Sequence, residues 1–338
     1  ASPDVTLEGR LIAFGSQIAS RRAWDEAATY ADWANAPVTT GAYKVQEYRP
    51  DVSLTLVAHD DYWGGRPPLA EIRFLEVPEV ASRVNGLLSG EYDFACDLPP
   101  DQLDAVRNTA GLEVQGSTIL NHRIQVFDKV HPVLSDPLIR RAMTHSIDRQ
   151  LIVNALWDGQ TKVPAGLQFE FYDDMFIKGW TAPEFNLEMA RDLVKQSGYQ
   201  GDAIPFRVLN NYYINQVSNA QIMVEMWKQA GLNVEIQMVE NWGQVLEDND
   251  TRGIRDWSNS ATFNDPVSSI VAQHGPNGLQ QQRNEWSNVE MNELSNFMQK
   301  STDRGARKKA FARMLEITER EDPAFQVLHQ NCVFTGMK

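Results

Sequence analysis

An uncharged stretch with closely spaced hydroxyl groups is the segment of the chain best suited to bind a small polar ligand. It reads Trp257-Ser-Asn-Ser-Ala-Thr-Phe-Asn-Asp-Pro266. If the backbone is extended as far as Thr262, alternate side chains point the same way, so Ser258, Ser260 and Thr262 line one face. Hydroxyls and the neighbouring backbone groups can donate and accept hydrogen bonds. The alternative is a purely structural edge strand that runs into an Asx-type turn at Asn264-Asp265-Pro266, and both interpretations stay open.

Aromatic residues form a second set of candidates for ligand contact. Tyr212 and Tyr213 follow a predicted strand that ends at Leu209, and Trp242 lies further along the chain. Residues at the end of a strand are well placed for a cleft, where an aromatic ring can stack on a ligand. Such residues more often belong to a core or a surface, so their role in binding is a hypothesis.

Residue patterns that would support catalysis or cofactor binding are absent from the sequence. The six histidines contain no pair at the i, i+4 or short-loop spacing that brings two imidazoles onto one metal, so we expect no metal site and no cofactor. There is no GxSxG, GxxxxGKS/T or GxGxxG motif. Acidic pairs such as Asp60-Asp61, Asp173-Asp174 and Glu247-Asp248 could act as acid and base in a glycoside or peptide hydrolase. Nothing fixes the separation of two carboxylates that such chemistry needs, so we expect no catalytic residue and keep the hydrolase as the alternative.

Length and composition indicate a globular protein of two domains. The 338 residues are enough to build two cores with a cleft between them, and 42% of them are hydrophobic. The formal net charge of −14 argues against nucleic acid or an anionic membrane surface as a partner, because like charges repel. No apolar run approaches the length of a membrane span, and the first residues lack the regions of an export signal, so we expect any such signal to be cleaved or left out. Two cysteines, Cys96 and Cys332, are too few for a disulfide framework.

Hydrophobic periodicity places the candidate residues among helices and strands. Before residue 98 the pattern is mixed, and after it helices alternate with single strands, which is typical of an α/β layer. The clearest unit covers residues 215–239, where a helical stripe is followed by Gly231 at a left-handed C-cap position and by an alternating strand. The other predicted helices cover 24–34, 288–300, 303–320 and a segment through Leu87-Leu88, and the other predicted strands cover 43–48, 53–57, 71–77, 92–96, 325–328 and 332–334.

Several short motifs then follow one another over most of the chain. They are Thr40-Gly-Ala-Tyr-Lys-Val45, His59-Asp-Asp-Tyr-Trp-Gly-Gly-Arg-Pro-Pro-Leu69, Leu87-Leu-Ser-Gly-Glu-Tyr-Asp-Phe94, Asp136-Pro-Leu-Ile-Arg-Arg-Ala-Met143, Ser146-Ile-Asp-Arg149 and Trp227-Lys-Gln-Ala-Gly-Leu-Asn-Val234. Together they resemble family 5 of the extracellular solute-binding proteins, the oligopeptide- and dipeptide-type receptors of ABC importers. The N-terminal block of the family and the segment after its last strand are absent here, so we expect a fragment.

The resemblance implies a fold class and a division into lobes. The implied class is α/β, a two-lobed fold like that of type II periplasmic binding proteins, with the second lobe complete and the first partial. Residues 1–97 would form a partial lobe I of helix, hairpin and mixed sheet, residues 98–323 the α/β lobe II, and residues 324–338 a strand that returns to lobe I. Cys96 and Cys332 would then flank neighbouring strands at the two crossings, and a disulfide between them is a hypothesis.

The implied function is solute capture rather than catalysis. A receptor of this family would hold a peptide-like, opine or sugar-like solute between its lobes and deliver it to an ABC permease in the membrane. Closure would follow from the higher affinity of the closed form for the ligand. The resemblance implies a monomer in the periplasm, or a lipid-anchored protein outside the cell, without a nucleic-acid partner.

The resemblance also implies which residues contact the ligand. The positions that match ligand-contacting positions of the family are Ser258, Asn259, Ser260, Thr262, Trp242, Asn249, Tyr212, Tyr213, Gln216 and Asp101. Peptide receptors of the family hold the ligand's terminal ammonium with an aspartate, and Thr262 stands at that position. A neutral hydroxyl makes a weaker hydrogen bond to an ammonium than a carboxylate does, so we expect weak binding of free-amine peptides unless Asp265 takes over.

Overall fold

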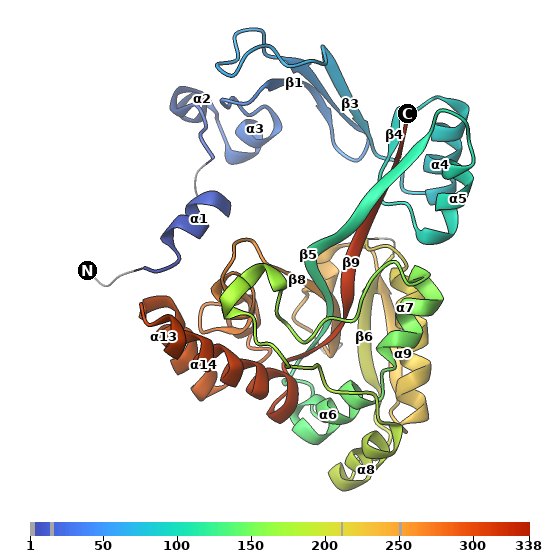
Figure 1. Cartoon of the computed structure of the whole chain (residues 1–338), viewed down its shortest axis with the longest axis vertical. Helices are drawn as coiled ribbons and strands as arrows, with labels where there is room; N and C mark the ends of the chain where they lie inside the picture. Colours follow the sequence, from blue (N-terminus) through green and yellow to red (C-terminus); the bar gives the residue numbers. More distant parts are fainter. Residues whose placement is uncertain (1–3, 14–16, 211, 250–251) are drawn as a thin grey trace. The chain divides into compact units, whose positions relative to one another are not determined.

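The computed structural model describes residues 4–13, 17–210, 212–249 and 252–338 of the chain. The chain divides into a large unit, residues 1–10 and 93–338, and a small unit, residues 11–92 (Figure 1). The division lies close to the predicted boundary between residues 97 and 98. The assignment of the segments to two lobes stays a prediction.

The small unit carries a three-stranded antiparallel sheet. Its strands confirm the predicted hairpin and third strand: β1 (Tyr43–Arg49) pairs with β2 (Ser53–Ala58), and β2 pairs with β3 (Glu71–Leu75). Helix α4 (Val80–Ser89) follows and ends at Gly90, whose φ of 81° is the left-handed conformation that favours glycine.

The single helix predicted over residues 24–34 is wrong, because two short helices form there. After α1 (Leu7–Ala13), the structure has α2 (Arg21–Glu26) and α3 (Tyr30–Asn35). The Thr29 hydroxyl accepts a hydrogen bond from the Asp32 backbone N–H at 3.2 Å and donates one to the Asp32 carboxylate at 2.8 Å. This N-cap begins a new helix at a point where the apolar pattern alone suggests continuity.

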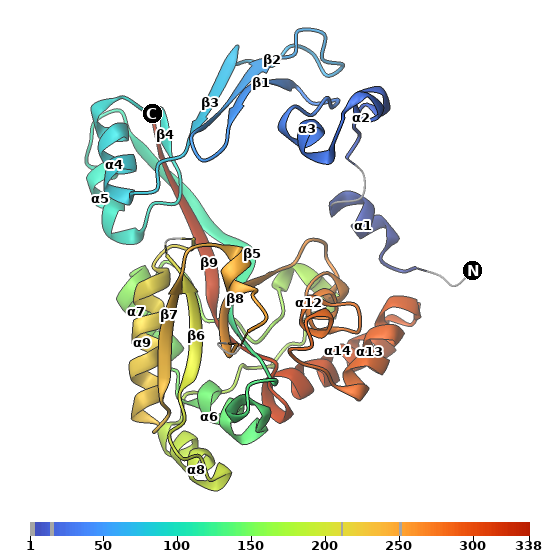
Figure 2. The same cartoon turned by 180° about the vertical axis from the view of Figure 1, so that it is seen from behind.

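A six-stranded mixed sheet forms the middle of the large unit (Figures 1 and 2). Its strand order is β4-β9-β5-β8-β6-β7, in which β6 runs parallel to β7 and β8 and the remaining pairs are antiparallel. The two strands predicted near the C-terminus are one continuous strand, β9. The bounds are β4 (Phe94–Ala95), β5 (Glu113–Phe127), β6 (Ile204–Leu209), β7 (Val234–Val239), β8 (Ile254–Ser260) and β9 (Phe325–Met337).

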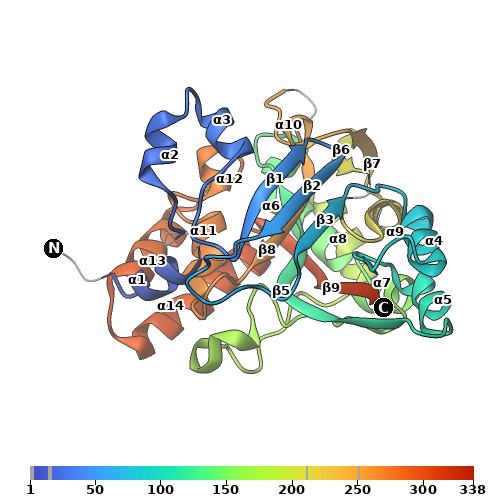
Figure 3. The same ribbon diagram turned by 90° about the horizontal axis from the view of Figure 1, so that it is seen from above.

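Helices cover both faces of this sheet, with α13 and α14 on one side and α7 and α9 on the other (Figure 3). Because neighbouring strand residues point to opposite faces, Val327 belongs to the core under α14, and Leu328 belongs to the core under α9. The helices are α5 (Leu103–Arg107), α6 (Pro137–His145), α7 (Arg149–Trp157), α8 (Leu187–Ser197), α9 (Gln216–Gln229), α10 (Trp242–Val245), α11 (Ile270–His274), α12 (Leu279–Gln282), α13 (Val289–Lys300) and α14 (Arg304–Glu316).

The helix-cap-strand unit predicted over residues 215–239 is confirmed. Helix α9 is followed by Gly231 with a φ of 92°, and then by β7. The late predicted helix is α14, in which Phe311, Met314 and Leu315 are buried. It continues as a π-helical turn over Ile317–Glu321. No helix in the described part of the chain has both the length and the apolar character needed to cross a bilayer.

The two cysteines are free thiols, so the hypothesis of a disulfide between them is wrong for this structure. In the β4–β9 ladder Phe94 pairs with Met337 and Ala95 with Gly336. Continuation of that register places Cys96 beside Thr335, three strand positions from Cys332. That separation is about 10 Å along a strand, beyond the roughly 7 Å that a disulfide spans between Cα atoms.

Candidate functional site

Candidate ligand-binding residues follow the ends of three parallel strands of the large unit. Tyr212 and Tyr213 come after β6, Trp242 comes after β7, and Ser258 and Ser260 lie at the end of β8. Parallel strands end at the same edge of a sheet, which is where ligands of α/β proteins usually bind. The topology therefore brings together residues that are far apart in the sequence.

Four aromatic rings form a continuous group at this edge. The ring centroids of Tyr212 and Tyr213 are 4.7 Å apart, and those of Tyr212 and Trp242 are also 4.7 Å apart. Trp242 in turn lies 4.8 Å from Trp257, with the two rings nearly perpendicular. Tyr212 is 59% exposed and Trp242 is half-buried. The group thus offers ring surface to solvent next to the serine residues.

Strand β8 has one paired edge, and on its other edge the described residues form a ladder with its first residues only. The Ala261 N–H donates to the Leu120 carbonyl at 3.0 Å, which sets the phase of the antiparallel ladder with β5. Because hydrogen-bonded pairs alternate in such a ladder, the backbone groups of Ser258 and Ser260 point away from β5. On that side β6 pairs with β8 only at Ile254 and Arg255. Ser258 and Ser260 therefore present backbone groups to a side where β6 does not reach them.

The hydroxyls of Ser258 and Ser260 are held by two neighbouring side chains. Asn121 on β5 donates its Nδ2 to the Ser258 Oγ at 3.1 Å and to the Ser260 Oγ at 2.6 Å. The Tyr213 hydroxyl donates to the Ser258 Oγ at 3.0 Å. Burial raises the pKa of Tyr213, so its hydroxyl keeps its proton and acts as a donor. Sequence reasoning missed Asn121, although the alternation in Arg123-Ile-Gln-Val126 beside it is a visible signal of a strand.

A buried ion pair lies beneath this wall. Arg123 and Asp256 are 1% and 2% exposed and form a salt bridge, and the Arg123 guanidinium carbon lies 3.4 Å from the centre of the Tyr213 ring. Burial raises the pKa of Asp256, opposed by Arg123, and burial lowers the pKa of Arg123. The two charges compensate each other, so the wall above them is close to neutral. Neither residue was predicted, because a charged residue in a strand looks like a surface position in the sequence.

Gln216 connects the ion pair to the tyrosine loop. Its Nε2 donates to the Asp256 carboxylate at 2.8 Å, and its Oε1 accepts from the backbone N–H groups of Tyr212 and Tyr213, both at 3.1 Å. Gln216 is itself buried at the start of α9. The amide therefore fixes the position of both tyrosines relative to β8.

The other predicted ligand-contacting residues lie in different surroundings. Asn259 is fully buried, and its Nδ2 lies 3.5 Å from the Ser269 carbonyl oxygen. Thr262 is exposed beyond the end of β8, which stops at Ser260. Asp265 forms a two-point ion pair with Arg307 at 2.7 and 2.8 Å, so its carboxylate is already engaged.

Two further predicted residues are separated from the serine wall. Asn249 lies outside α10, and its side-chain oxygen accepts a hydrogen bond from Arg207. Asp101 is exposed and accepts a hydrogen bond from Gln102 at 3.2 Å. It belongs to the segment whose Leu98 N–H donates to the carbonyl of Phe334, which pairs with Gly116 on β5. Their part in ligand contact stays a prediction.

The acidic pairs considered for catalysis are engaged elsewhere. Asp174 forms an ion pair with Arg304, and Asp248 forms one with Arg252. Within residues 4–13, 17–210, 212–249 and 252–338, no group of three or more His, Cys, Asp or Glu residues is arranged to hold a metal ion.

Comparisons with known proteins show the family and the fold. Residues 1–278 match the family model described as bacterial extracellular solute-binding proteins, family 5 middle. The nickel-binding protein NikA of Staphylococcus aureus is 25% identical over 221 residues, which are 64% of this chain and 44% of that protein. The chain spans less than half the length of the curated relatives it matches.

Solved structures show the same fold. A dipeptide-binding protein of Pseudoalteromonas sp. SM9913 in complex with Met-Leu has a TM-score of 0.87 at 19% identity, over 100% of this chain and 68% of that one. AgaA from A. tumefaciens R10 in complex with agropinic acid has a TM-score of 0.86 at 17% identity, over 100% of this chain and 69% of that one. The predicted class, an α/β fold of the type II periplasmic binding protein kind, is confirmed.

Proposed function

Because the chain belongs to family 5 of the bacterial extracellular solute-binding proteins, we propose that it is the ligand-capturing part of an ABC importer receptor. In this role it binds a small polar solute without breaking a bond and delivers it to a permease in the membrane. We place it outside the cytoplasmic membrane, in the periplasm or as a lipid-anchored protein at the cell surface.

The open edge of β8 is the observation that carries the proposal. Ser258 and Ser260 present backbone groups there, and among the described residues the Ser258 carbonyl accepts a hydrogen bond from the Gln273 Nε2 at 3.3 Å. An extended ligand can pair with such an edge as an added strand, which supplies affinity through main-chain hydrogen bonds. The aromatic group beside it, Tyr212 and Trp242 in particular, then covers a ligand side chain or ring.

The neutral character of the wall favours a ligand with hydrogen-bonding groups and little net charge. Ser258, Ser260 and Tyr213 contribute only hydroxyls, and the nearby Arg123 and Asp256 neutralise each other. A peptide-like solute fits best, since its amide groups match the edge of β8. Opine-like and sugar-like solutes share the same polar chemistry. The solved relatives with Met-Leu and agropinic acid support this range of ligand classes.

Two substitutions of one residue test the pairing with β8. Native mass spectrometry of the 338-residue chain with a panel of free and N-acetylated dipeptides, opines and oligosaccharides first identifies a ligand. Its affinity is then measured by calorimetry for Ser258→Ala, which removes the hydroxyl, and for Ser258→Pro, which also removes the backbone N–H. The Ser258 N–H points away from β5, so proline leaves the β5–β8 ladder intact.

We expect Ser258→Pro to bind about tenfold more weakly than Ser258→Ala, the effect of one lost hydrogen bond. Equal affinities of the two variants would show that the ligand does not pair with this edge. Conversion of any panel member into products would support the hydrolase alternative and reject the receptor.

A further inference from the structure

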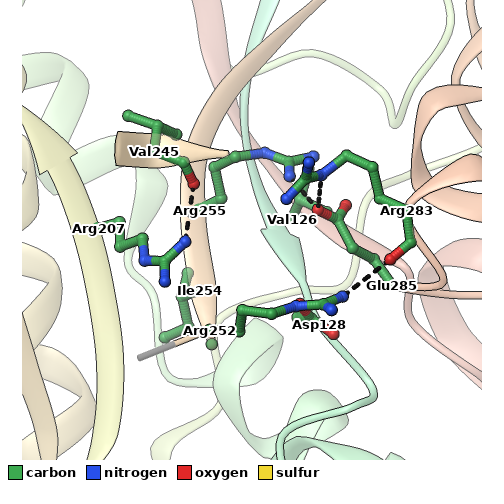
Figure 4. Close-up of a pocket in the computed structure, with 10 residues that line it drawn as sticks. Val126, Asp128, Arg207, Val245, Arg252, Ile254, Arg255, Arg283 and Glu285 are labelled. Atoms are coloured by element: carbon green, nitrogen blue, oxygen red, sulfur yellow. Dashed lines mark hydrogen bonds and ion pairs between the residues drawn. The ribbon is translucent and has the colours of Figure 1, made fainter. Parts of the chain in front are cut away.

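The cavity at the beginning of β8 is too small to hold a transported solute (Figure 4). It has room for about one water molecule, and Ser258 and Ser260 do not line it. Its polar side chains bond to one another, as where the Arg283 Nε donates to the Glu285 carboxylate at 2.7 Å. We therefore place the solute at the other end of β8, at the wall formed by Ser258 and Ser260.

The amide of Asn121 decides which way the serine hydroxyl groups point. Asn121 lies directly opposite Ser260 in the β5–β8 ladder, and its Nδ2 donates to the Oγ atoms of Ser258 and Ser260 at 3.1 and 2.6 Å. Its Oδ1 accepts a hydrogen bond from the Asn331 Nδ2, so the amide is held with its nitrogen toward the serines. Each serine oxygen is an acceptor for Asn121 and keeps its own proton to donate elsewhere.

The hydroxyl of Tyr213 strengthens this arrangement at Ser258. It donates to the Ser258 Oγ at 3.0 Å, so Asn121 and Tyr213 together occupy both lone pairs of that oxygen. The Ser258 proton is then the one left to donate. Among the described residues, none accepts a hydrogen bond from the Ser258 or the Ser260 hydroxyl. Both serines are only half-buried, so a ligand can reach these protons.

The backbone of the same two residues adds further donors. The N–H groups of Ser258 and Ser260 point away from β5, and no described residue accepts from them. The Ser258 carbonyl on the same side is engaged, since it accepts from the Gln273 Nε2 at 3.3 Å. The Gln280 Nε2 donates to the Gln273 Oε1 at 3.0 Å and so holds the Gln273 amide with its nitrogen toward Ser258. The wall therefore offers more donors than acceptors.

The buried ion pair beneath the wall adds donors rather than acceptors. Arg123 lies directly opposite Ser258 in the ladder, with its side chain on the same face of the sheet. Its Nε and Nη1 are buried without a hydrogen-bond partner in the described structure. Both oxygens of Asp256, in contrast, accept hydrogen bonds, and the donors are Arg123, Gln125 and Gln216. The unpartnered atoms of this pair are therefore donors as well.

On the basis of the proposed function, we propose that the ligand turns a carboxylate group toward Ser258 and Ser260, and that Asn121 sets this specificity. A carboxylate offers only acceptors, which match the excess of donors, and a hydrogen bond to an ionised group is roughly twice as strong as a neutral one. An ammonium group offers only donors and leaves those of the wall unpaired. A solute with one carboxylate keeps the low net charge that the wall favours.

Acetate and acetamide test the proposal, because they differ only in the replacement of one carboxylate oxygen by an amide N–H₂ group. Each is titrated into the isotope-labelled 338-residue chain at constant ionic strength, and NMR follows the backbone N–H resonances of Ser258 and Ser260. We expect saturable shifts with a Kd about tenfold lower for acetate than for acetamide, and none with methylammonium. Absence of acetate shifts, equal affinities for acetate and acetamide, or shifts with methylammonium would overturn the proposal.

Asn121→Asp reverses the direction of the hydrogen bonds at the wall with little change in side-chain size. A carboxylate at this position accepts from the serine hydroxyls, which then turn lone pairs toward the ligand. Acetate binding should be lost, and methylammonium should now shift the Ser258 and Ser260 resonances. Asn154→Asp adds the same charge at an exposed position of α7 and should bind acetate as the parent does. A purely structural role of Asn121 would weaken the binding of all probes alike and would refute its part in specificity.

Two further results keep the proposal separate from folding defects and from the proposed function. If Asn121→Asp does not fold, Ser260→Ala decides, because it removes one donor and should weaken acetate binding about tenfold; unchanged acetate affinity would overturn the proposal. A solute retained in native mass spectra without a preference for acetate would keep the receptor and reject the carboxylate. A preference for acetate with conversion of a panel member into products would keep the carboxylate and reject the receptor.

Discussion

Removal of the negative charge from the buried Arg123–Asp256 pair should destabilise the large unit strongly. In Asp256→Asn, the Arg123 guanidinium stays buried but loses its counter-charge, and the new amide N–H₂ group cannot accept a hydrogen bond from it. The hydrogen bonds that the carboxylate accepts from Gln216 at 2.8 Å and Gln125 at 3.3 Å are also disturbed. An uncompensated buried charge typically lowers the free energy of unfolding by about 4 kcal/mol.

Removal of both charges should be less harmful than removal of one. Burial raises the pKa of Asp256 and lowers the pKa of Arg123 despite their mutual attraction, so loss of hydration outweighs the pairing for each group. The double variant Arg123→Met/Asp256→Leu relieves both groups of this penalty. We expect it to lie within about 2 kcal/mol of the parent protein.

Thermal and urea unfolding of the three proteins measure these differences. The single variant should melt about 10 °C below the parent, given the size of the large unit. The double variant should melt at a temperature between the two. A single variant within 1 °C of the parent, or a double variant less stable than the single one, would refute the view that charge burial dominates this pair.

Three further predictions concern other buried groups. Burial raises the pKa of Glu319 to about 7, so the folded protein holds a proton that the unfolded chain releases above about pH 4.5. The contribution of this group to stability is present below that pH and falls by about 3 kcal/mol as the pH rises to 7. Urea titrations at several pH values should show that Glu319→Gln removes this fall. Burial lowers the pKa of His274 to about 3, so the unfolded chain takes up a proton below about pH 6.5 that the folded protein does not. Between pH 7 and pH 5 the free energy of unfolding of His274→Leu should therefore fall by about 2 kcal/mol less than that of the parent. Equal decreases in the two proteins would contradict this. At Gly116, where φ is 156°, a Cβ would lie 2.1 Å from the Val333 carbonyl oxygen, so Gly116→Ala should lower the free energy of unfolding by about 2 kcal/mol or more. The control is Gly111→Ala, at a φ of 83° with no atom within 4 Å of the added Cβ, which should show only the smaller backbone effect. Thermal unfolding compares the two variants.

Local sequence signals predicted correctly those helices and strands whose ends are marked by a residue within the same segment. Gly231 fixes the end of α9, and alternation fixes β7, so that unit is correct without reference to the rest of the fold. Where a polar N-cap interrupts an apolar pattern, as at Thr29, the periodicity predicted one helix instead of two. One side-chain hydrogen bond decides where the new helix begins, and the hydrophobic pattern of the sequence does not show that bond.

The candidate site was predicted in part, because half of it depends on pairing between distant segments. The hydroxyls at Ser258 and Ser260 follow from alternation along one strand. Asn121 and Arg123 become part of the site only through the register of β5 with β8, which is set by contacts across more than a hundred residues. Asn259 shows the converse, since its neighbours in sequence suggest a binding role and its place in the sheet buries it.

The position of β9 has a consequence for how the protein reaches its native state. Strand β9 lies inside the sheet, between β4 and β5, although it comes far later in the sequence than either of these neighbours. Contacts this distant in sequence slow folding and leave strand edges unprotected during synthesis. The nascent chain should therefore remain a substrate for chaperones until β9 has emerged from the ribosome, and a stop codon before Phe325 should produce insoluble polypeptide rather than a smaller folded protein.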